Sequence, residues 1–515
     1  MSHSLTLMAA LRVLPALVLG LFLYGCDSSK PITTTPFDPS TVDYDALTSV
    51  DYDDHVRPLL AARNVFGAAG AGAASPTDYD HDDVFGSEWG KTIVPFDATS
   101  PMIRLATETL VDELTNPYPN LAQLDEDEVR FLTRWIEAGA PDSDGTPAYA
   151  DSKNLLYVCN QLAGRVAIVD TDQMRTIRHV YFEDLDQPAD AKPHHVVVEP
   201  DGSAWYVALI SGGSGGGAVL RLSGSLETDP ADSSYLLANS TNHDEFEKPG
   251  MLSLDPVGGR LYSGRSFSAS ATSNGIGQFT NLSSLTFDVV ATPPYHPHAV
   301  EATPDGRHVL SAGLSSPNEV RMYDAATQDV VARAPVENGL AFVQFAVTSD
   351  SRAAVLTSQL SGELFVIDID PNAPSVSVRD RIAVGQQPWH PVISPDDETV
   401  YVPNRLSNSV SFVDLASGAV TRTVENPENG SEVFSQPHGA ALTADGRVLF
   451  VANRNLMMTG DALYQAPLRF VMEDGSPEPA DMYSPLVAID TQTGAILDVI
   501  QQGRWSSGLS AVRIP

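Results

Sequence analysis

A unit of about forty to fifty residues recurs along the last two thirds of this 515-residue chain. Each unit has a turn position that is usually Asp, an apolar or aromatic residue five places later, and a strand start eight places before the turn. A repeat of this length cannot bury its apolar face alone, so stacked neighbours predict a propeller or a solenoid. The turn positions are Asp201, Val257, Asp305, Asp350, Asp396 and Asp445, and the strand starts are Pro193, Pro249, Pro297, Phe342, Pro388 and Pro437.

Short turns separate the apolar strands within each unit. In a turn such as Pro200-Asp201-Gly202, the Asp side chain bonds nearby backbone and Gly accepts positive φ, so we expect a structural role for these Asp residues rather than a catalytic one. The third strand of a unit recurs with a terminal Asp, as in Phe412-Val413-Asp414. These patterns resemble the YVTN family of β-propeller repeats over residues 153–515, a resemblance that implies a fold and little about activity.

The two ends of the repeat region complete each other. The region opens with a second strand at residues 156–158, and the chain ends with a first strand at residues 509–514 that has no partners of its own. Six strand starts and this shared unit make seven blades, and pairing of the two ends removes the exposed sheet edges. We therefore predict a mainly β fold, a seven-bladed β-propeller closed by its C-terminal strand, and we expect a monomer.

Two excursions interrupt the repeats. The last full unit carries an insertion at residues 455–484, rich in Met, Pro and acidic residues, which predicts an exposed loop suited to contact with a partner protein. The glycine run at residues 212–217 lacks the Lys and the following helix of a phosphate-binding loop. We interpret it as a flexible excursion, and we find no G-x-S-x-G nucleophile elbow elsewhere in the sequence.

The N-terminus reads as an export signal. An apolar stretch from Val13 closes on Leu23-Tyr24-Gly25-Cys26, and it is too short to span a bilayer. It resembles a bacterial lipoprotein signal peptide, residues 1–25, which implies cleavage before Cys26 and acylation of that residue. Residues 26–50 are polar and Pro-rich, so we predict a flexible tether. The expected location is the cell envelope, with membrane lipid as a partner through Cys26.

Residues 51–148 have a helical pattern. Asp125 and Glu128 form a capping-box-like start, Gly139 can end that helix, and the Ser100 hydroxyl is expected to cap a second helix that begins with Pro101. This stretch resembles the small cytochrome c-type modules of envelope proteins, in which C-x-x-C-H binds haem covalently. The motif would place its two Cys at 64 and 67 and its His at 68, where the chain has Asn, Gly and Ala. We therefore expect a degenerate module that binds no haem.

Composition excludes several kinds of partner. The net charge is −36, with 66 acidic and 30 basic residues, so no basic patch is available for nucleic acid. Such an acidic, Lys-poor chain resembles proteins of halophilic organisms, in which salt screens carboxylate repulsion. Calcium binding by residues 78–89 would need Gly at the sixth loop position and Glu at the twelfth, where Asp83 and Trp89 stand. Once Cys26 is acylated, Cys159 has no partner for a disulfide.

Histidines follow the strand start in four units: His194 with His195, His298, His390 one place later, and His438. Because the first strand of each blade lines the propeller axis, these imidazoles should converge on one mouth. Neutral imidazole is a good ligand for copper and other late transition metals. The sequence thus offers these residues as candidate hub ligands, with His194, His298, His390 and His438 as the candidate metal set.

A structural role for the same histidines stays open. The rings would then fill the axis or bond neighbouring backbone, and three blades break the series with Gly250, Val343 and Leu509 at the corresponding place. An incomplete ring counts against a multinuclear cluster. Three other histidines are expected at the surface or in loops: His179, His243 and His308.

These observations favour a membrane-tethered envelope protein that binds another protein or a ligand, without catalysis and without a cofactor. A copper-dependent or electron-transfer oxidoreductase is the alternative, because cytochrome c modules joined to propellers occur in electron-transfer enzymes. A propeller lactonase is a third hypothesis, since some sugar-lactone hydrolases share this fold.

Overall fold

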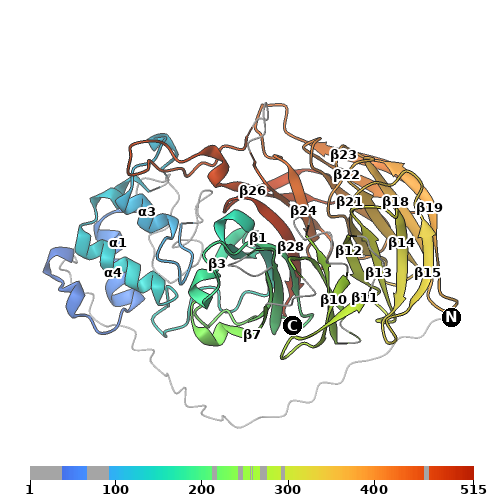
Figure 1. The fold of residues 1–515 in the computed structure, drawn as a ribbon. Coiled ribbons are helices and arrows are strands. Elements are labelled where there is room, and N and C mark those ends of the chain that lie inside the picture. The colour runs from blue at the N-terminus through green and yellow to red at the C-terminus, as the bar shows by residue number, and fades with distance from the viewer. Residues whose placement is uncertain are drawn as a thin grey trace, which may run out of the picture.

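The computed structural model describes residues 38–65, 92–116, 118–211, 217–241, 247–255, 257, 259–266, 275–291, 296–456 and 463–515. The signal peptide, Cys26, His243 and most of the glycine run lie outside these residues. Within them, helices occupy the N-terminal part and strands the remainder, as Figure 1 shows. None of the described helices is both long and apolar enough to cross a membrane.

The helical part, which we call the helical module, contains α1 (Arg57–Ala62), α3 (Pro101–Thr107) and α4 (Glu126–Glu137). The longest helix, α4, starts with the predicted capping box: the Asp125 carboxylate accepts from the backbone of Glu128, whose own carboxylate accepts from the backbone of Asp125. Phe131, Leu132, Trp135 and Ile136 bury its inner face. The helix ends before Gly139, which adopts φ +95°.

The predicted cap of the second helix is wrong. Ser100 precedes α3, but its hydroxyl bonds no helix amide; it donates to the Val94 carbonyl and accepts from the Val94 amide, both at 2.9 Å. The backbone of the preceding turn therefore takes this hydroxyl. Pro101 still begins the helix, because its fixed φ suits the first helical position and it has no amide to satisfy.

The described strands form seven four-stranded antiparallel sheets, so the fold is a seven-bladed β-propeller as predicted. From the axis outward, the strands of blades 1 to 4 are β28 (Ser506–Arg513), β1 (Asn154–Asn160), β2 (Arg165–Asp170), β3 (Arg175–Tyr181); β4 (Pro193–Val198), β5 (Ala204–Leu209), β6 (Ala218–Ser223), β7 (Leu236–Thr241); β8 (Pro249–Asp255), β9 (Arg260–Arg265), β10 (Gly275–Asn281), β11 (Thr286–Ala291); and β12 (Pro297–Ala302), β13 (His308–Gly313), β14 (Glu319–Asp324), β15 (Val330–Pro335). Those of blades 5 to 7 are β16 (Phe342–Val347), β17 (Ala353–Ser358), β18 (Glu363–Asp370), β19 (Ser375–Ala383); β20 (Val392–Ile393), β21 (Thr399–Asn404), β22 (Ser409–Asp414), β23 (Ala419–Glu425); and β24 (Pro437–Leu442), β25 (Val448–Asn453), β26 (Ser484–Asp490), β27 (Ile496–Gln502).

Blade 1 closes the ring with both ends of the chain. Strand β28 pairs antiparallel with β1, and the register sets Leu509 opposite Val158 and Val512 opposite Leu155. The prediction that the C-terminal strand completes the first blade is confirmed. The strand begins at Ser506, three residues earlier than the sequence pattern indicated.

Burial on both faces of each blade explains the apolar strands. In β5, every side chain is buried, and successive residues pack against the two neighbouring blades in turn. Trp205 packs toward blade 1 against Tyr157, with ring centroids 5.2 Å apart, whereas Tyr206 joins a cluster with Leu252 and Leu261 of blade 3. Within the blades, the repeat Asp residues cap the turn after the first strand: Asp305, between β12 and β13, accepts from the backbone amide of Arg307, as predicted.

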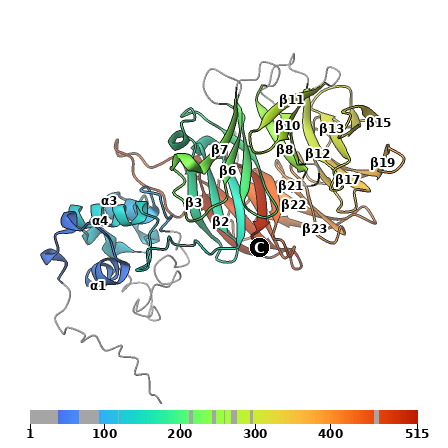
Figure 2. The same ribbon diagram turned by 90° about the horizontal axis from the view of Figure 1, so that it is seen from below.

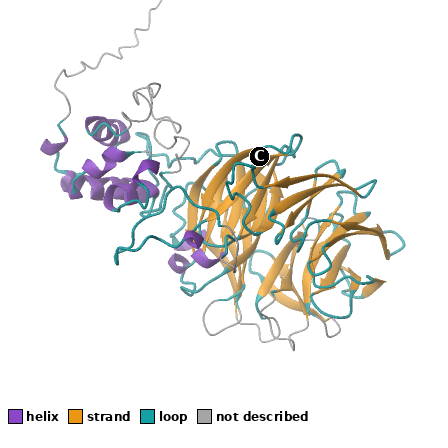
Figure 3. Cartoon of the chain, turned by 90° about the horizontal axis from the view of Figure 1, so that it is seen from above, coloured by secondary structure: helices purple, strands orange, loops and turns teal. Residues whose placement is uncertain are grey.

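The helical module packs on the outside of blades 1 and 7, and Figures 2 and 3 show its helices gathered at this side of the propeller. One hydrophobic cluster runs from α4 through Tyr149 into Tyr157 and Trp205 of the propeller. The Arg178 side chain of β3 also crosses the junction: its guanidinium carbon lies 5.0 Å from the Phe96 ring centre and it donates to the Ala148 carbonyl. The two parts therefore share a core.

Candidate functional site

The propeller axis brings the predicted histidines together. His194 lies with its ring centre 6.4 Å from His298, 6.4 Å from His390 and 5.9 Å from His438, and His390 and His438 are 4.5 Å apart. His195 lies 5.7 Å from His390. All five side chains are buried. We call this cluster the hub.

Hydrogen bonds of the hub histidines run between blades. His298 Nδ1 donates to the Val343 carbonyl of blade 5 at 2.7 Å, and His195 Nδ1 accepts from the Leu252 amide of blade 3 at 3.2 Å. His194 Nδ1 lies 3.0 Å from Gln161 Oε1 of blade 1. These contacts link neighbouring blades, which is the structural role that the sequence left open.

Backbone at the hub is tightly packed. A Cβ built on Gly439 would lie 2.1 Å from the Ser507 carbonyl oxygen, and one on Gly508 would lie 2.6 Å from the His194 carbonyl oxygen. This register also corrects one prediction: in blade 1 the residue at the histidine position is Ser507, not Leu509. Ser507 is fully buried and donates to the His194 carbonyl at 3.1 Å. Because Ser506-Ser507 carries no Pro-His signal, the sequence alone misplaced it.

Burial favours the neutral form of the hub imidazoles. It lowers the pKa of His195 to about 3 and that of His298 to about 4, and it holds the pKa of His194, His390 and His438 well below the ordinary value. In the described part of the chain, no three His, Cys, Asp or Glu side chains are arranged to hold a metal ion. The copper site stays a prediction, which elemental analysis of the purified protein tests.

The residues of the helical module do not fit covalent haem. The chain has two cysteines, Cys26 and Cys159, and the second is buried in the propeller. His55, the histidine of the module's first turn, accepts from the backbone amide of Asp51 through Nδ1 at 3.1 Å. Next to position 64, where the haem-binding motif would begin, Arg63 forms a 2.8 Å ion pair with the buried Glu128.

A concave region lies between the helical module and the propeller. It is a cavity of about 1140 Å³, which we call the cleft, bounded by α3, by β27 and blade 1, and by residues 463–483 of the insertion. Apolar side chains line part of it, including Ile103, Leu468 and Phe470. Polar side chains that line it include Arg165, His179 and Gln502. The combination of a large volume with a few convergent polar groups is typical of a small-molecule site.

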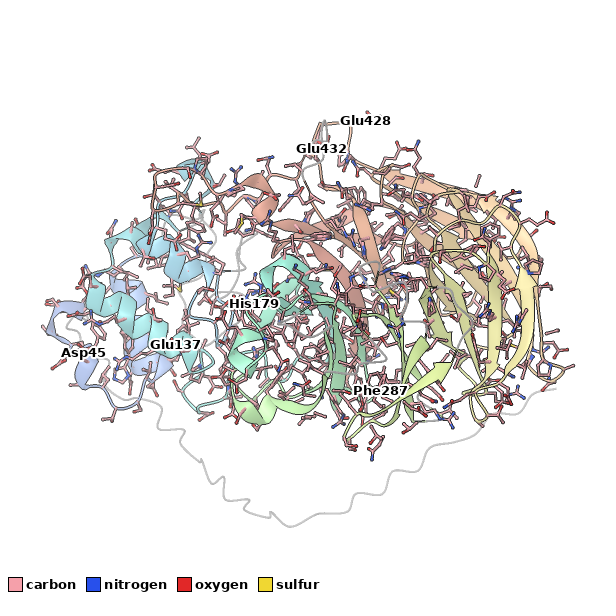
Figure 4. All side chains as sticks on the ribbon, viewed as in Figure 1. Asp45, Glu137, His179, Phe287, Glu428 and Glu432 are labelled. Atoms are coloured by element: carbon pink, nitrogen blue, oxygen red, sulfur yellow. The ribbon has the colours of Figure 1, made fainter. Side chains whose placement is uncertain are left out.

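Asp97 and His179 form a polar pair at the wall of the cleft. His179, on the outermost strand of blade 1, donates through Nδ1 to Asp97 Oδ2 of the helical module at 2.6 Å. Figure 4 places His179 on the side of the propeller that faces the helices. Burial and the nearby Arg165 lower the pKa of His179 to about 4 despite the carboxylate. Burial would raise the pKa of Asp97, but the His179 hydrogen bond holds it below the ordinary value. A neutral imidazole therefore faces an ionised carboxylate.

Two arginines line the cleft on either side of Gly503. Arg165 donates to the Tyr181 hydroxyl, and Arg504 forms a 2.6 Å ion pair with Asp481. The Nε atoms of Arg165 and Arg504 are buried and have no hydrogen-bond partner among the described residues. A Cβ at Gly503 would come within 3.2 Å of Arg165 Nε, so this glycine lets the arginine lie against the backbone.

Residues 463–483, which we call the strap, bind the helical module instead of standing free. Leu110 and Phe470 form an isolated β-bridge, and the Val111 amide donates to the Arg469 carbonyl at 2.8 Å. Arg104 of α3 donates to Glu478 at 2.8 Å and lies 3.9 Å over the Phe470 ring. In Figure 1 the red strap reaches from blade 7 to the blue and cyan helices. The strap therefore makes an internal contact through Leu468 and Phe470, whereas Met472 and Met482 are exposed as predicted. Residues 457–462 of the predicted loop lie outside the described residues.

Sequence reasoning missed His179 and the strap. His179 was expected at the surface, yet its side chain is 10% exposed and paired with Asp97. His308, also expected there, is buried on β13. Alternation along β3 separates His179 from Val180, but the bulge that leaves Ile177 unpaired breaks the pattern just before them. The alternation does not name a partner 82 residues away.

Comparisons with known proteins agree with the fold. The family described as "Lactonase, 7-bladed beta-propeller" matches residues 225–457, a stretch that contains His298, His390 and His438. No curated protein matches the chain.

Solved structures match the chain at low sequence identity. A putative 6-phosphogluconolactonase from Bacteroides fragilis has 16% identity and a TM-score of 0.51, covering 71% of this chain and 99% of its own. A protein from Lactobacillus plantarum has 14% identity and a TM-score of 0.51, covering 70% and 99%. A functionally unknown protein from Desulfotomaculum acetoxidans has 13% identity and a TM-score of 0.50, covering 70% and 100%. At these identities the likeness concerns the fold.

Proposed function

We propose that this chain is an exported, lipid-anchored binding protein that holds a small organic ligand in the cleft, without catalysis of its own. The observation that carries the proposal is the 1140 Å³ cleft, whose walls come from the helical module, the propeller and the strap. Three separate parts of the chain must meet to form it. Such a junction between domains is a common place for a ligand site.

The lining indicates the kind of ligand. Ile103, Leu468 and Phe470 offer apolar surface, and Arg165 and Arg504 line the same cavity. Each guanidinium carries several N–H groups, so an acceptor on a ligand can bind those that face the cavity. The cleft is therefore suited to an organic molecule with an apolar body and an acceptor group such as a carboxylate or sulfonate.

The anchor places this site at a membrane surface. Acylation of Cys26 would hold the cleft within reach of the envelope and of a protein partner there. The predicted tether does not extend over residues 38–50, because these residues pack on the helical module, where Tyr44 is buried against Phe131. Fractionation of cells that express the full chain tests this part. The native chain should sediment with membranes, and a Cys26→Ser variant should move to the soluble fraction; equal sedimentation of both would contradict the anchor.

The ligand site is tested with anilinonaphthalene sulfonate, a fluorescent probe that has an aromatic body and an anionic group. Val499 lines the cleft from β27, the outermost strand of blade 7. A Val499→Trp variant should place an indole in the cleft and strongly reduce the probe fluorescence, and Arg165→Met should weaken binding about tenfold.

The matched control is Val420→Trp on β23, the outermost strand of blade 6, where the side chain is 40% exposed. This variant adds the same ring outside the cleft and should leave probe binding unchanged. Equal probe affinity in the native chain and in both tryptophan variants would exclude the cleft as the site.

A lactonase is the second candidate, and the family match over residues 225–457 favours it. The matched stretch includes His298 and His438, so the hub would hold the reacting groups. Hydrolysis of 6-phosphogluconolactone by the purified chain, lost in His438→Ala, would support this function. No hydrolysis above that of the buffer would leave the binding function as the account of the chain.

A further inference from the structure

Arg454 is a buried cation without an opposite charge. It follows strand β25 at the axis, with 8% of its surface exposed, and among the described residues it forms no ion pair. Its Nη2 donates to the neutral His438 Nε2 at 2.6 Å, and its Nε has no hydrogen-bond partner in the described part of the chain. Burial lowers the pKa of Arg454 well below the ordinary value, and the neighbouring Arg405 lowers it further. An uncompensated buried guanidinium is costly.

Other buried or partly buried arginines have oxygen partners among the described residues. Arg104 has the carboxylates of Glu108 and Glu478, and Arg321 lies 2.5 Å from the Glu319 carboxylate. Arg178 donates to three backbone carbonyls. Arg454 is the exception, because its hydrogen-bond partner among the described residues is an imidazole nitrogen and not an oxygen.

Aromatic faces and a second guanidinium complete the surroundings. The Arg454 guanidinium carbon lies 4.7 Å from the Trp505 ring centre and 5.4 Å from that of Trp389. The Arg405 guanidinium carbon also lies 5.4 Å from Trp389, and its Nη2 donates to Gln436 Oε1 at 3.4 Å. Two like charges therefore share one indole, an arrangement that an anion would relieve.

The rim of the axis adds further positive charge. Lys192 and Lys248 stand directly before the first strands of blades 2 and 3, at the repeat position that Gln387 and Gln436 occupy in blades 6 and 7. The whole chain has five lysines, Lys30, Lys91, Lys153, Lys192 and Lys248, so two of them gather at this rim of an otherwise acidic protein. Arg405 is only half-buried and connects Arg454 to this rim.

We propose that the mouth of the propeller axis binds a small oxyanion, a carboxylate or a phosphate, between Arg454 and Arg405. A guanidinium fork matches the two oxygens of such a group, and the indoles of Trp389 and Trp505 shield the contact from water. The site is separate from the cleft and does not depend on the function proposed for it. A carboxylate and a phosphate share this recognition chemistry, and the experiment distinguishes them.

Thermal unfolding of the purified mature chain tests the site. The native protein is compared in sodium chloride, sodium phosphate and sodium acetate at equal ionic strength. Phosphate or acetate at about 20 mM should raise the unfolding midpoint by several degrees over chloride, because a ligand that binds only the folded state stabilises it. A shift with one anion alone assigns that anion.

Two variants decide whether Arg454 carries the effect. Arg454→Met should unfold in chloride at an equal or higher temperature than the native chain and should show no anion shift, since it removes an uncompensated charge. Arg405→Gln should fold normally and lose at least half of the shift. Arg447→Met, at an arginine whose side chain is 84% exposed, is the control and should keep the full shift. No shift with either anion, or an equal shift in Arg454→Met, would overturn the proposal.

Discussion

The hub and the cleft both gather side chains from distant parts of the chain, but one is tightly packed and the other is open. At the hub, a single added Cβ at Gly439 would come within 2.1 Å of a neighbouring carbonyl oxygen. Between the helical module and the propeller, about 1140 Å³ remains among the described residues. Side chains that converge in the fold are thus not always accessible to a ligand. The repeat uses its histidines to join blades, and the large cleft lies where the repeat is interrupted.

The largest effect should come from opening the ring. Deleting residues 506–515 removes β28, which leaves β1 without its inner partner and exposes its edge. We expect a loss of about 5 kcal/mol or more, comparable to the whole net stability of a domain. Circular dichroism during heating measures it. Deleting only the exposed Pro515 should be nearly neutral, and a cooperative unfolding transition near the native temperature in the longer deletion would contradict closure.

The second largest effect should come from acid, which destabilises the folded hub. Folded His195 and His298 have pKa values of about 3 and about 4, below the ordinary value of about 6.5, so the unfolded chain takes up protons first. The contribution of these two histidines to stability is therefore complete above pH 6.5 and is lost progressively as the pH drops toward their folded pKa values. Urea unfolding at pH 7, 6 and 5 measures the slope.

A paired comparison separates the contribution of the hub. His298→Gln should reduce the acid sensitivity by about one proton between pH 6.5 and pH 4, because one buried neutral imidazole is gone. His179→Gln should do the same through the cleft, whose histidine has a folded pKa of about 4. Acid sensitivity that is unchanged in both variants would show that other groups cause it.

A single substitution at the hub should lower the free energy of unfolding less than acid does, but more than the corresponding substitution in the cleft. His298→Ala removes a fully buried ring and the hydrogen bond that this ring donates to the Val343 carbonyl. We therefore expect the free energy of unfolding to fall by about 2–4 kcal/mol. His179→Ala should cost about 1–2 kcal/mol, since water in the cleft can replace the ring. Urea unfolding at pH 7 compares the two. A greater loss for His179→Ala would reverse the contrast between the two regions.

The smallest effect should be local. Arg104→Met removes the hydrogen bonds to Glu478 and Tyr483 that hold the strap on the helical module. We expect the strap to open more easily by about 1–2 kcal/mol, with global stability nearly unchanged. Hydrogen exchange should be faster at residues 467–471 and unaltered in β4. Arg130→Met, at a side chain 53% exposed, is the control, and unchanged exchange in the strap would refute its anchoring by Arg104.

The repeat made the propeller predictable. Equivalent Asp turns and strand starts predicted the number of blades. The unmatched strands at residues 156–158 and 509–514 predicted how the ring closes. The same register placed His194, His298 and His438 together at the axis, where the structure has them. Equivalent repeat positions converge by symmetry, so this geometry needs no knowledge of long-range contacts.

Contacts outside the repeat could not be predicted in this way. Asp97 and His179 lie 82 residues apart, and Arg104 and Glu478 lie 374 apart, with no periodic pattern to relate them. The strap was interpreted as exposed because Met, Pro and acidic residues dominate it, yet Leu468 and Phe470 are buried. The tertiary partner decides burial in such segments, and local composition does not reveal that partner.

A crystal structure of the mature chain with anilinonaphthalene sulfonate tests the central claim most directly, namely that ligands enter the cleft and that the hub is packed. We predict electron density for the probe between Val499 and Ile103, with its sulfonate near Arg165 and with the hub histidines in their present hydrogen bonds. Density for the probe among His194, His298 and His438, with the cleft empty, would contradict the account.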